Sequence, residues 1–232
     1  FEGVTVTGTE NLIMAASLAK GVSILTNVAK EPEILDLADF LNSMGAKISG
    51  AGTDKITVEG VEELSGTTYE IPADRIEAGT YLIAGAVTNG NITINKIDPE
   101  RMGAIIQNLK KAGAEVISNE KSISLNMTNR ILKPVNIVTA PFPGFPTDMQ
   151  AQFTVLNCMG QGESRVTETI FENRFMHIQE LNRMGTNIRI DGTTAIIRGV
   201  DSISGAQVMA TDLRASASLI LAGLVAKGET VV

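Results

Sequence analysis

Cysteine, histidine and aromatic residues are scarce in this chain of 232 residues. There is no Trp, only 4% of the residues are aromatic, and Cys158 and His177 are the single cysteine and histidine. A lone cysteine cannot form an internal disulfide, and a zinc site needs a cluster of His and Cys ligands. The sequence therefore excludes a disulfide scaffold and predicts neither a metal site nor a bound cofactor.

Positive charge is also in short supply. The 19 Lys and Arg residues are scattered among 26 Asp and Glu residues, which gives a net charge of −7. Binding to a nucleic-acid backbone needs clustered Lys and Arg. A nucleic-acid partner is therefore not expected, and any anionic ligand must be bound by local groups.

Long apolar runs are missing as well. The longest, "LILAGLVA" at 219–226, is well short of the roughly 20 residues that span a bilayer. A membrane partner is therefore not expected. Because the start of the sequence does not resemble a signal peptide and Cys158 is unpaired, we expect a cytoplasmic location.

What the chain does contain is an internal repeat, marked by two sets of glycines in the same register. The first set is Gly21, Gly90, Gly162 and Gly228, and the second is Gly45, Gly113 and Gly185. Both sets recur about every 70 residues, and their agreement makes coincidence improbable.

Each repeat is predicted to fold as a β-α-β-α-β-β unit. A short strand ("VTVTG", "TYEIP", "VNIVT", "QVMAT") precedes a helix that is apolar nearly all round, and a second strand, an amphipathic helix such as 31–45 and a hairpin follow. An apolar helix must be buried, whereas alternating strands leave one face of a sheet in water. The predicted fold is α/β, with helices inside and sheets outside.

The fourth repeat is incomplete. The chain begins inside a predicted strand and stops at "GETVV", where the other repeats continue. We expect the chain to be a fragment of a longer repeat protein.

The first helix of each repeat begins with polar residues, including Asp74, Asp148 and Asp212. One interpretation is capping alone: Thr147 with Gln150, and Asp74 with Glu77, fit the capping box. The other is that these helix N-termini converge on one cleft, where their N–H groups bind an anion and Asp148 acts as a general base. The sequence pattern leaves both open.

The segments "VTVTGTEN", "FPTDMQAQFT", "TETIFENRFMH" and "SGAQVMATDLRASASL" resemble the UDP-N-acetylglucosamine 1-carboxyvinyltransferases, which are enolpyruvyl transferases, and the resemblance covers the whole chain. It implies an EPSP synthase-like fold, in which each domain is an inside-out α/β barrel. Residues 1–73 would be the last repeat of one domain and residues 74–232 most of the second.

The resemblance also implies a reaction: transfer of the enolpyruvyl group of phosphoenolpyruvate to the 3′-hydroxyl of UDP-N-acetylglucosamine, with release of phosphate. This is the first committed step of peptidoglycan synthesis, on which cell-wall biogenesis, cell shape, cell cycle and cell division depend. Asp148 would take the hydroxyl proton. The backbone of Ile170 would contact the nucleotide sugar, and Val4, Thr5 and Val6 would bind its uridine diphosphate end.

Other positions match family motifs near the cleft without a settled role: Glu31, Arg174, Asp212 and Arg214. This chain departs from the family at Gly3, where a lysine is often found in family members. The family's reactive cysteine loop lies before residue 1 and one phosphoenolpyruvate-binding arginine lies after residue 232, so these residues alone are expected to be inactive.

Cys158 is not the family's reactive cysteine and is expected in the core. His177 is expected to be a packing or surface residue. Two alternatives to the leading function stay open: an enolpyruvyl transferase that acts on shikimate phosphate, and a non-catalytic module that binds a nucleotide sugar or a protein. The sequence does not fix the oligomeric state.

Overall fold

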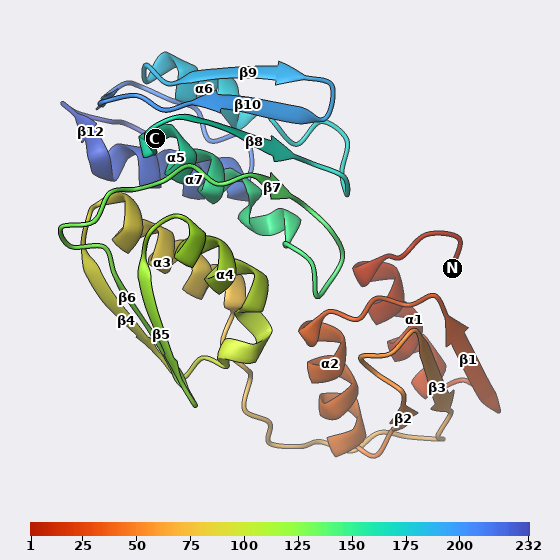
Figure 1. Ribbon diagram of the computed structural model, residues 1–232. Helices are drawn as coiled ribbons and strands as arrows, with labels where there is room; N and C mark the ends of the chain where they lie inside the picture. The colour runs from red at the N-terminus through yellow and green to blue at the C-terminus, as the bar shows by residue number, and fades with distance from the viewer. The chain divides into compact units, whose positions relative to one another are not determined.

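The computed structural model describes residues 1–232 and divides them into two compact units (Figure 1). Unit 1 contains residues 1–72 together with 141–143, and unit 2 contains residues 73–140 and 144–232. No helix in either unit is long and apolar enough to cross a membrane.

Unit 1 is one helical layer on one antiparallel sheet. Its elements are α1 (Val6–Ser17), β1 (Val22–Thr26), α2 (Pro32–Ser43), β2 (Lys47–Ser49) and β3 (Lys55–Glu59), and the strand order is β1-β3-β2. The two helices pack together and on the sheet, around a core that includes Ile13, Ile34 and Ile56. Helix α2 begins with a proline, and of the apolar residues at helical spacing it buries Ile34, Ala38 and Leu41, while Leu37 is partly buried against the same core.

The first repeat of unit 2 has the same plan. It consists of α3 (Arg75–Val87), β4 (Asn91–Asn95), the short 3₁₀ helix η1 (Pro99–Met102), α4 (Gly103–Lys111), β5 (Glu115–Asn119) and β6 (Ser122–Asn126). Its sheet is antiparallel with the order β4-β6-β5.

The second repeat of unit 2 adds a fourth strand to its sheet. It consists of β7 (Ile137–Val138), η2 (Thr147–Met149), α5 (Gln150–Met159), β8 (Glu163–Thr167), α6 (His177–Arg183), β9 (Asn187–Asp191) and β10 (Thr194–Arg198). The strand order is β7-β8-β10-β9, and only β7 and β8 are parallel. Then come β11 (Ile203–Ser204), α7 (Leu213–Val225) and β12 (Ala226–Lys227), where β11 and β12 form a parallel pair.

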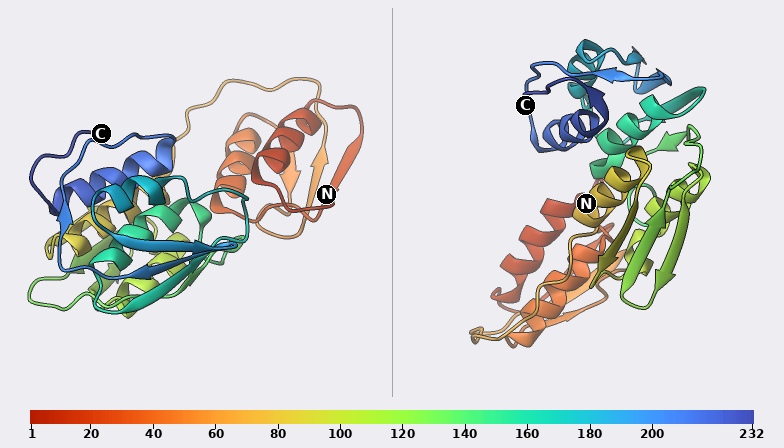
Figure 2. Two further views of the ribbon diagram at one scale, coloured as in Figure 1. Left: turned by 90° about the horizontal axis from the view of Figure 1, so that it is seen from above. Right: turned by 90° about the vertical axis from the view of Figure 1, so that its left-hand side faces the viewer.

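Helices α3 and α5 lie inside unit 2, as predicted, whereas α7 buries one face and leaves Leu213, Ile220 and Leu224 exposed. Helices α3, α5 and α7 pack against one another, while α3 also contacts β4 and β6 and α5 contacts β8 and β10 (Figure 2). Every residue of α5 except Met159 is buried. The strands of the two repeats form separate sheets outside these helices. The predicted α/β arrangement, with helices inside and sheets outside, is confirmed for unit 2.

The second set of glycines has a conformational role that fits the repeat. Gly45, Gly113 and Gly185 follow α2, α4 and α6 with φ angles of +102°, +98° and +90°. This left-handed backbone, which favours glycine, ends each helix and turns the chain into the hairpin.

The predicted first strand of each repeat forms only in one case. "VNIVT" contains β7, but α1 already begins at Val6, residues 68–72 have no regular structure, and Gln207 makes a single bridge to Val231. A strand needs a neighbour to pair with. The segment with β7 lies against β8, whereas the corresponding outer edges of β1 and β4 carry no strand. Sequence alternation does not show which edge is occupied.

The lone cysteine and histidine are both core residues. Cys158 is fully buried in α5, and burial raises the pKa of its thiol to about 12. His177 is 3% exposed at the start of α6, and burial lowers the pKa of its imidazole to about 4, although the charge of Asp212 acts in the opposite direction. The core role predicted for Cys158 is confirmed, and His177 is a packing residue.

Candidate active site around Asp148

Asp148 lies in η2, the single 3₁₀ turn before the buried helix α5. Neither η2 nor α5 has a side-chain capping hydrogen bond. The predicted capping box of Thr147 and Gln150 is therefore wrong. The capping box does not form because other side chains bind these groups. The hydroxyl of Thr147 is bound by Glu168 and Arg174, and the carboxylate of Asp148 is bound by Arg174 and Arg214.

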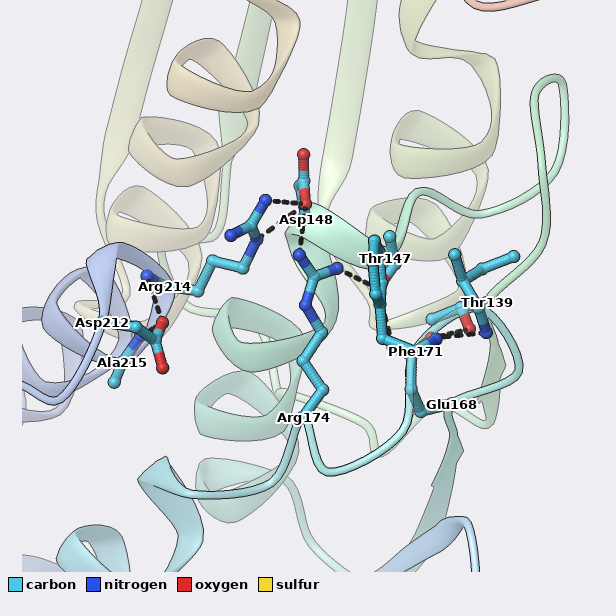
Figure 3. A network of polar contacts seen from close by, with 10 residues as sticks. Thr139, Thr147, Asp148, Glu168, Phe171, Arg174, Asp212, Arg214 and Ala215 are labelled. Atoms are coloured by element: carbon cyan, nitrogen blue, oxygen red, sulfur yellow. Dashed lines mark hydrogen bonds and ion pairs between the residues drawn. The ribbon is translucent and has the colours of Figure 1, made fainter. Parts of the chain in front are cut away.

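Two arginines meet at one oxygen of Asp148 (Figure 3). Oδ1 accepts from Nε of Arg214 at 2.6 Å and lies 2.5 Å from its Nη2 and 3.1 Å from Nη2 of Arg174. The other carboxylate oxygen, Oδ2, points away from both guanidinium groups (Figure 3). The side chain of Asp148 is 38% exposed, and the contacts of both arginines fall on Oδ1 rather than on Oδ2.

Arg174 comes from the loop between β8 and α6 and is the more buried of the two arginines. Its guanidinium donates to Thr147 as well as to Asp148, and its central carbon lies 4.2 Å from the centre of the Phe171 ring. Partial burial and the charge of Arg214 lower the pKa of Arg174, against the opposing effects of Asp148 and Glu168. An arginine remains charged under such conditions.

Arg214 reaches Asp148 from the first turn of α7, which Asp212 caps. The carboxylate of Asp212 accepts from the backbone N–H of Arg214 at 2.8 Å and of Ala215 at 3.0 Å. The hydrogen bond from Ala215 is the main reason why the pKa of Asp212 is lowered, with help from Arg214 and against partial burial. In this structure Asp212 is a helix cap, and the cap fixes the point from which Arg214 extends.

Glu168 is a residue of this site that the sequence patterns did not single out. It follows β8, is only 2% exposed, and accepts hydrogen bonds from the hydroxyls of Thr139 and Thr147 and from the backbone N–H groups of Ile170 and Phe171. A glutamate at a strand end is usually solvated, and nothing in the local pattern distinguishes it from one. Its burial depends on the loops that cover it.

The residues predicted for the site fall into two groups. Asp148, Ile170, Arg174, Asp212 and Arg214 belong to unit 2. Of these, Arg174 and Arg214 contact Asp148 directly, Asp212 caps the helix that carries Arg214, and the N–H of Ile170 is bound by Glu168 at 2.8 Å. Ile170 itself is 38% exposed.

The other predicted residues, Val4, Thr5, Val6 and Glu31, belong to unit 1. Thr5 caps α1 by accepting from the N–H of Gly8 at 3.2 Å, next to the exposed Val4. Val6 is the first residue of that helix, and Glu31 precedes Pro32 without making a capping hydrogen bond.

Side chains supply positive charge at the site, and two of the three apolar helices of unit 2, α3 and α7, have capped N-termini, whereas η2 and α5 have no side-chain cap. The first N–H groups of α3 and α7 are bound by Asp74 and Asp212. Arg174 and Arg214 instead offer guanidinium groups, which suit carboxylates and phosphates. In this acidic chain, two arginines converge where an anion can be bound beside a carboxylate. No group of three or more His, Cys, Asp or Glu side chains is arranged to hold a metal ion.

Comparisons with known proteins agree on one family. A family model described as EPSP synthase (3-phosphoshikimate 1-carboxyvinyltransferase) matches residues 1–232. The UDP-N-acetylglucosamine 1-carboxyvinyltransferase of Hydrogenovibrio crunogenus is 62% identical over 231 residues, which are 100% of this chain and 55% of that protein. The protein of the same name from Coxiella burnetii is 58% identical over 229 residues, 99% of this chain and 53% of that protein.

Solved structures give the same fold. The enolpyruvyl transferase NikO from Streptomyces tendae matches with a TM-score of 0.84 at 25% identity, over 94% of this chain and 52% of that chain. An EPSP synthase from Acinetobacter baumannii matches with a TM-score of 0.70 at 19% identity, over 97% and 55%, and supports the fold alone. The chain spans about half the length of the curated relatives that it matches.

Proposed function

The chain belongs to the EPSP synthase family of enolpyruvyl transferases, and on that premise we propose that the complete protein is a UDP-N-acetylglucosamine 1-carboxyvinyltransferase. It transfers the enolpyruvyl group of phosphoenolpyruvate to the 3′-hydroxyl of UDP-N-acetylglucosamine. The activity belongs to the complete protein, with residues 1–73 as the last repeat of one domain and residues 74–232 as most of the second.

The observation that carries this proposal is the carboxylate of Asp148 beside two arginines. A general base must reach the proton that it removes, and Oδ2 is the oxygen that neither arginine contacts. Both substrates are anionic. The guanidinium groups of Arg174 and Arg214 lie where they can stabilise negative charge on a substrate and keep the carboxylate in one orientation.

The proposed step balances without a cofactor. The hydroxyl oxygen of the acceptor bonds to C2 of the enolpyruvyl group, the bond from C2 to the phosphate oxygen breaks, and phosphate leaves. Asp148 takes the hydroxyl proton, which finally departs with phosphate. Ile170 contacts the nucleotide sugar through its backbone, and Val4, Thr5 and Val6 bind the uridine diphosphate end. Glu31 in unit 1 and Asp212 in unit 2 are further residues proposed to face the substrates.

The biological setting is proposed from the same relatives. A carboxyvinyltransferase that acts on UDP-N-acetylglucosamine serves peptidoglycan synthesis, and through it cell-wall growth, cell shape and cell division. Because the proposed substrates are cytoplasmic small molecules, we propose that the protein acts in the cytoplasm. The relatives at 58–62% identity that carry this name support the choice of acceptor.

The test is phosphate release by the full-length protein with phosphoenolpyruvate and each of two acceptors. We expect turnover with UDP-N-acetylglucosamine and none with shikimate 3-phosphate. The description of the family model names the second acceptor, so turnover with shikimate 3-phosphate alone would establish that alternative. Binding of UDP-N-acetylglucosamine without phosphate release would instead favour a non-catalytic module.

A further inference from the structure

Glu168 is a buried carboxylate for which the proposed chemistry has no direct use. It is 2% exposed, and its two oxygens accept four hydrogen bonds from three separate segments of unit 2. Burial of a charged group is unfavourable unless it is hydrogen-bonded. The arrangement of these donors indicates what the carboxylate contributes.

The two hydrogen bonds of the Thr147 hydroxyl can run in only one direction. A guanidinium group can only donate, so the oxygen of Thr147 must accept from Arg174. The single hydroxyl proton then goes to Oε2 of Glu168, 2.7 Å away. Glu168 therefore orients Thr147, Thr147 orients Arg174, and Arg174 holds Oδ1 of Asp148 at 3.1 Å (Figure 3).

The second oxygen of Glu168 holds the turn that follows β8. Oε1 accepts from the N–H of Ile170 at 2.8 Å and of Phe171 at 3.2 Å. It also accepts the hydroxyl of Thr139 at 2.8 Å, whose oxygen in turn accepts from the N–H of Thr169. The same carboxylate thus fixes the peptide of Ile170 and the base of the loop that carries Arg174.

We propose that Glu168 is a positioning residue of the reaction proposed above: one oxygen sets the orientation of Asp148 through Thr147 and Arg174, and the other fixes the Ile170 backbone that contacts the acceptor. This inference rests on the proposed function, because its two effects are on turnover and on acceptor binding. Glu168 is buried and does not itself touch a substrate.

Glu168→Gln is the informative substitution because it keeps the size but adds donor hydrogens. If the amide nitrogen replaces Oε1, it faces three donors. If it replaces Oε2, Thr147 must accept from both the amide and Arg174, and its own proton loses its acceptor. The network has two arms, one from Oε1 to the turn at Ile170 and one from Oε2 through Thr147 and Arg174 to Asp148. Either orientation of the amide breaks one of them.

In the full-length enzyme we expect Glu168→Gln to lower kcat by about 10- to 100-fold, since small displacements of a reacting group have effects of this size. It should also weaken binding of UDP-N-acetylglucosamine. Thr147→Val removes only the arm to Asp148, so kcat should fall in the same range while the Kd of UDP-N-acetylglucosamine changes by less than about threefold. Thr147→Ser keeps the hydroxyl and should restore kcat.

A matched control is Thr194→Val on β10. The hydroxyl of Thr194 contacts that of Thr167 at 2.9 Å, one residue before Glu168, but makes no contact with the network. We expect both kcat and Kd of this variant to stay within about threefold of the parent.

A folded Glu168→Gln enzyme with kcat and Kd like those of the control would overturn the inference. If Glu168→Gln does not fold, equal kcat values for Thr147→Val and Thr147→Ser would overturn it. If the parent does not release phosphate with UDP-N-acetylglucosamine, the proposed function fails separately. Hydrogen exchange of the peptide 168–174 then decides: exchange at Ile170 and Phe171 should be faster in Glu168→Gln than in Thr194→Val, and equal rates would contradict the positioning role.

Discussion

Arg214 directs two nitrogens, Nε and Nη2, at a single oxygen of Asp148, at 2.6 and 2.5 Å. The usual bidentate pair uses both carboxylate oxygens. Here both nitrogens of Arg214 contact Oδ1, which Arg174 also contacts at 3.1 Å. Neither arginine contacts Oδ2. The geometry thus distinguishes the two oxygens of one carboxylate: both arginines orient Oδ1, and in the proposed reaction Oδ2 takes the proton.

Asp148→Asn in the full-length enzyme should lower turnover by about 10²- to 10⁴-fold, the usual contribution of a general base. The amide cannot take the hydroxyl proton, but it keeps the size of the side chain, so we expect the Kd of UDP-N-acetylglucosamine to change by less than about tenfold. Phosphate release and calorimetric binding measure the two effects.

The matched control is Asp98→Asn, because Asp98 caps η1 and pairs with Arg101 outside the site. Its turnover should match that of the parent. A folded Asp148→Asn enzyme as active as this control would show that Asp148 is not the base.

Arg214→Lys tests whether geometry or charge matters at Asp148. Lysine keeps the positive charge but cannot place two nitrogens in a planar fork, so Asp148 should be less well oriented. We expect kcat/KM to fall by about 10- to 100-fold. Arg165→Lys is the control, because Arg165 is exposed and lies 3.8 Å from Glu163 on the same sheet. If the two variants are equally active, charge alone is sufficient.

His177 should make unfolding depend on pH. Its pKa is lowered to about 4 by burial, so the unfolded chain binds the proton first as the pH falls. The stability that the neutral form contributes is therefore complete above about pH 6.5 and is lost toward pH 4, at roughly 1.4 kcal/mol per pH unit. Urea unfolding of the parent and of His177→Gln, from pH 7.5 to 4.5, measures this. Parallel curves for the two proteins would contradict it.

Cys158 should be unreactive until the protein unfolds. The thiolate is the reactive form, and burial raises the pKa of this thiol to about 12. We expect N-ethylmaleimide at pH 7.5 to leave Cys158 unmodified in the native protein and to label it completely in urea, as followed by mass spectrometry of the peptide that contains it. Rapid labelling without denaturant would mean that α5 opens readily.

The repeat was predictable because its markers are local. Gly45 ends a helix with a left-handed backbone and Pro32 begins one, and neither requirement depends on distant residues. The first strands were not predictable, since a strand such as β7 exists only where another strand, here β8, leaves an edge to pair with. The periodicity of a segment gives no information about which strand lies beside it in the folded protein.

The grouping of three site residues was predictable for a different reason, the resemblance of long sequence motifs to a family. The resemblance to a family gave Asp148, Arg174 and Arg214, and the structure brings these three together. The capping interpretation of Thr147 failed because its hydroxyl has a better partner 21 residues later in the chain, the carboxylate of Glu168. Glu168 itself was missed because its burial is created by tertiary contacts.

The burial of α5 has a consequence for the tolerance of the protein to change. All residues from Gln150 to Cys158 are buried. A larger side chain on any side of this helix therefore cannot be accommodated by pointing into solvent. Close-packed interiors deform little, and Asp148 lies two residues before this helix. The turn that carries Asp148 therefore leads directly into a helix that is packed on all sides. We therefore expect a change of side-chain size in α5 to shift the backbone that carries Asp148, even though the helix need not touch a substrate.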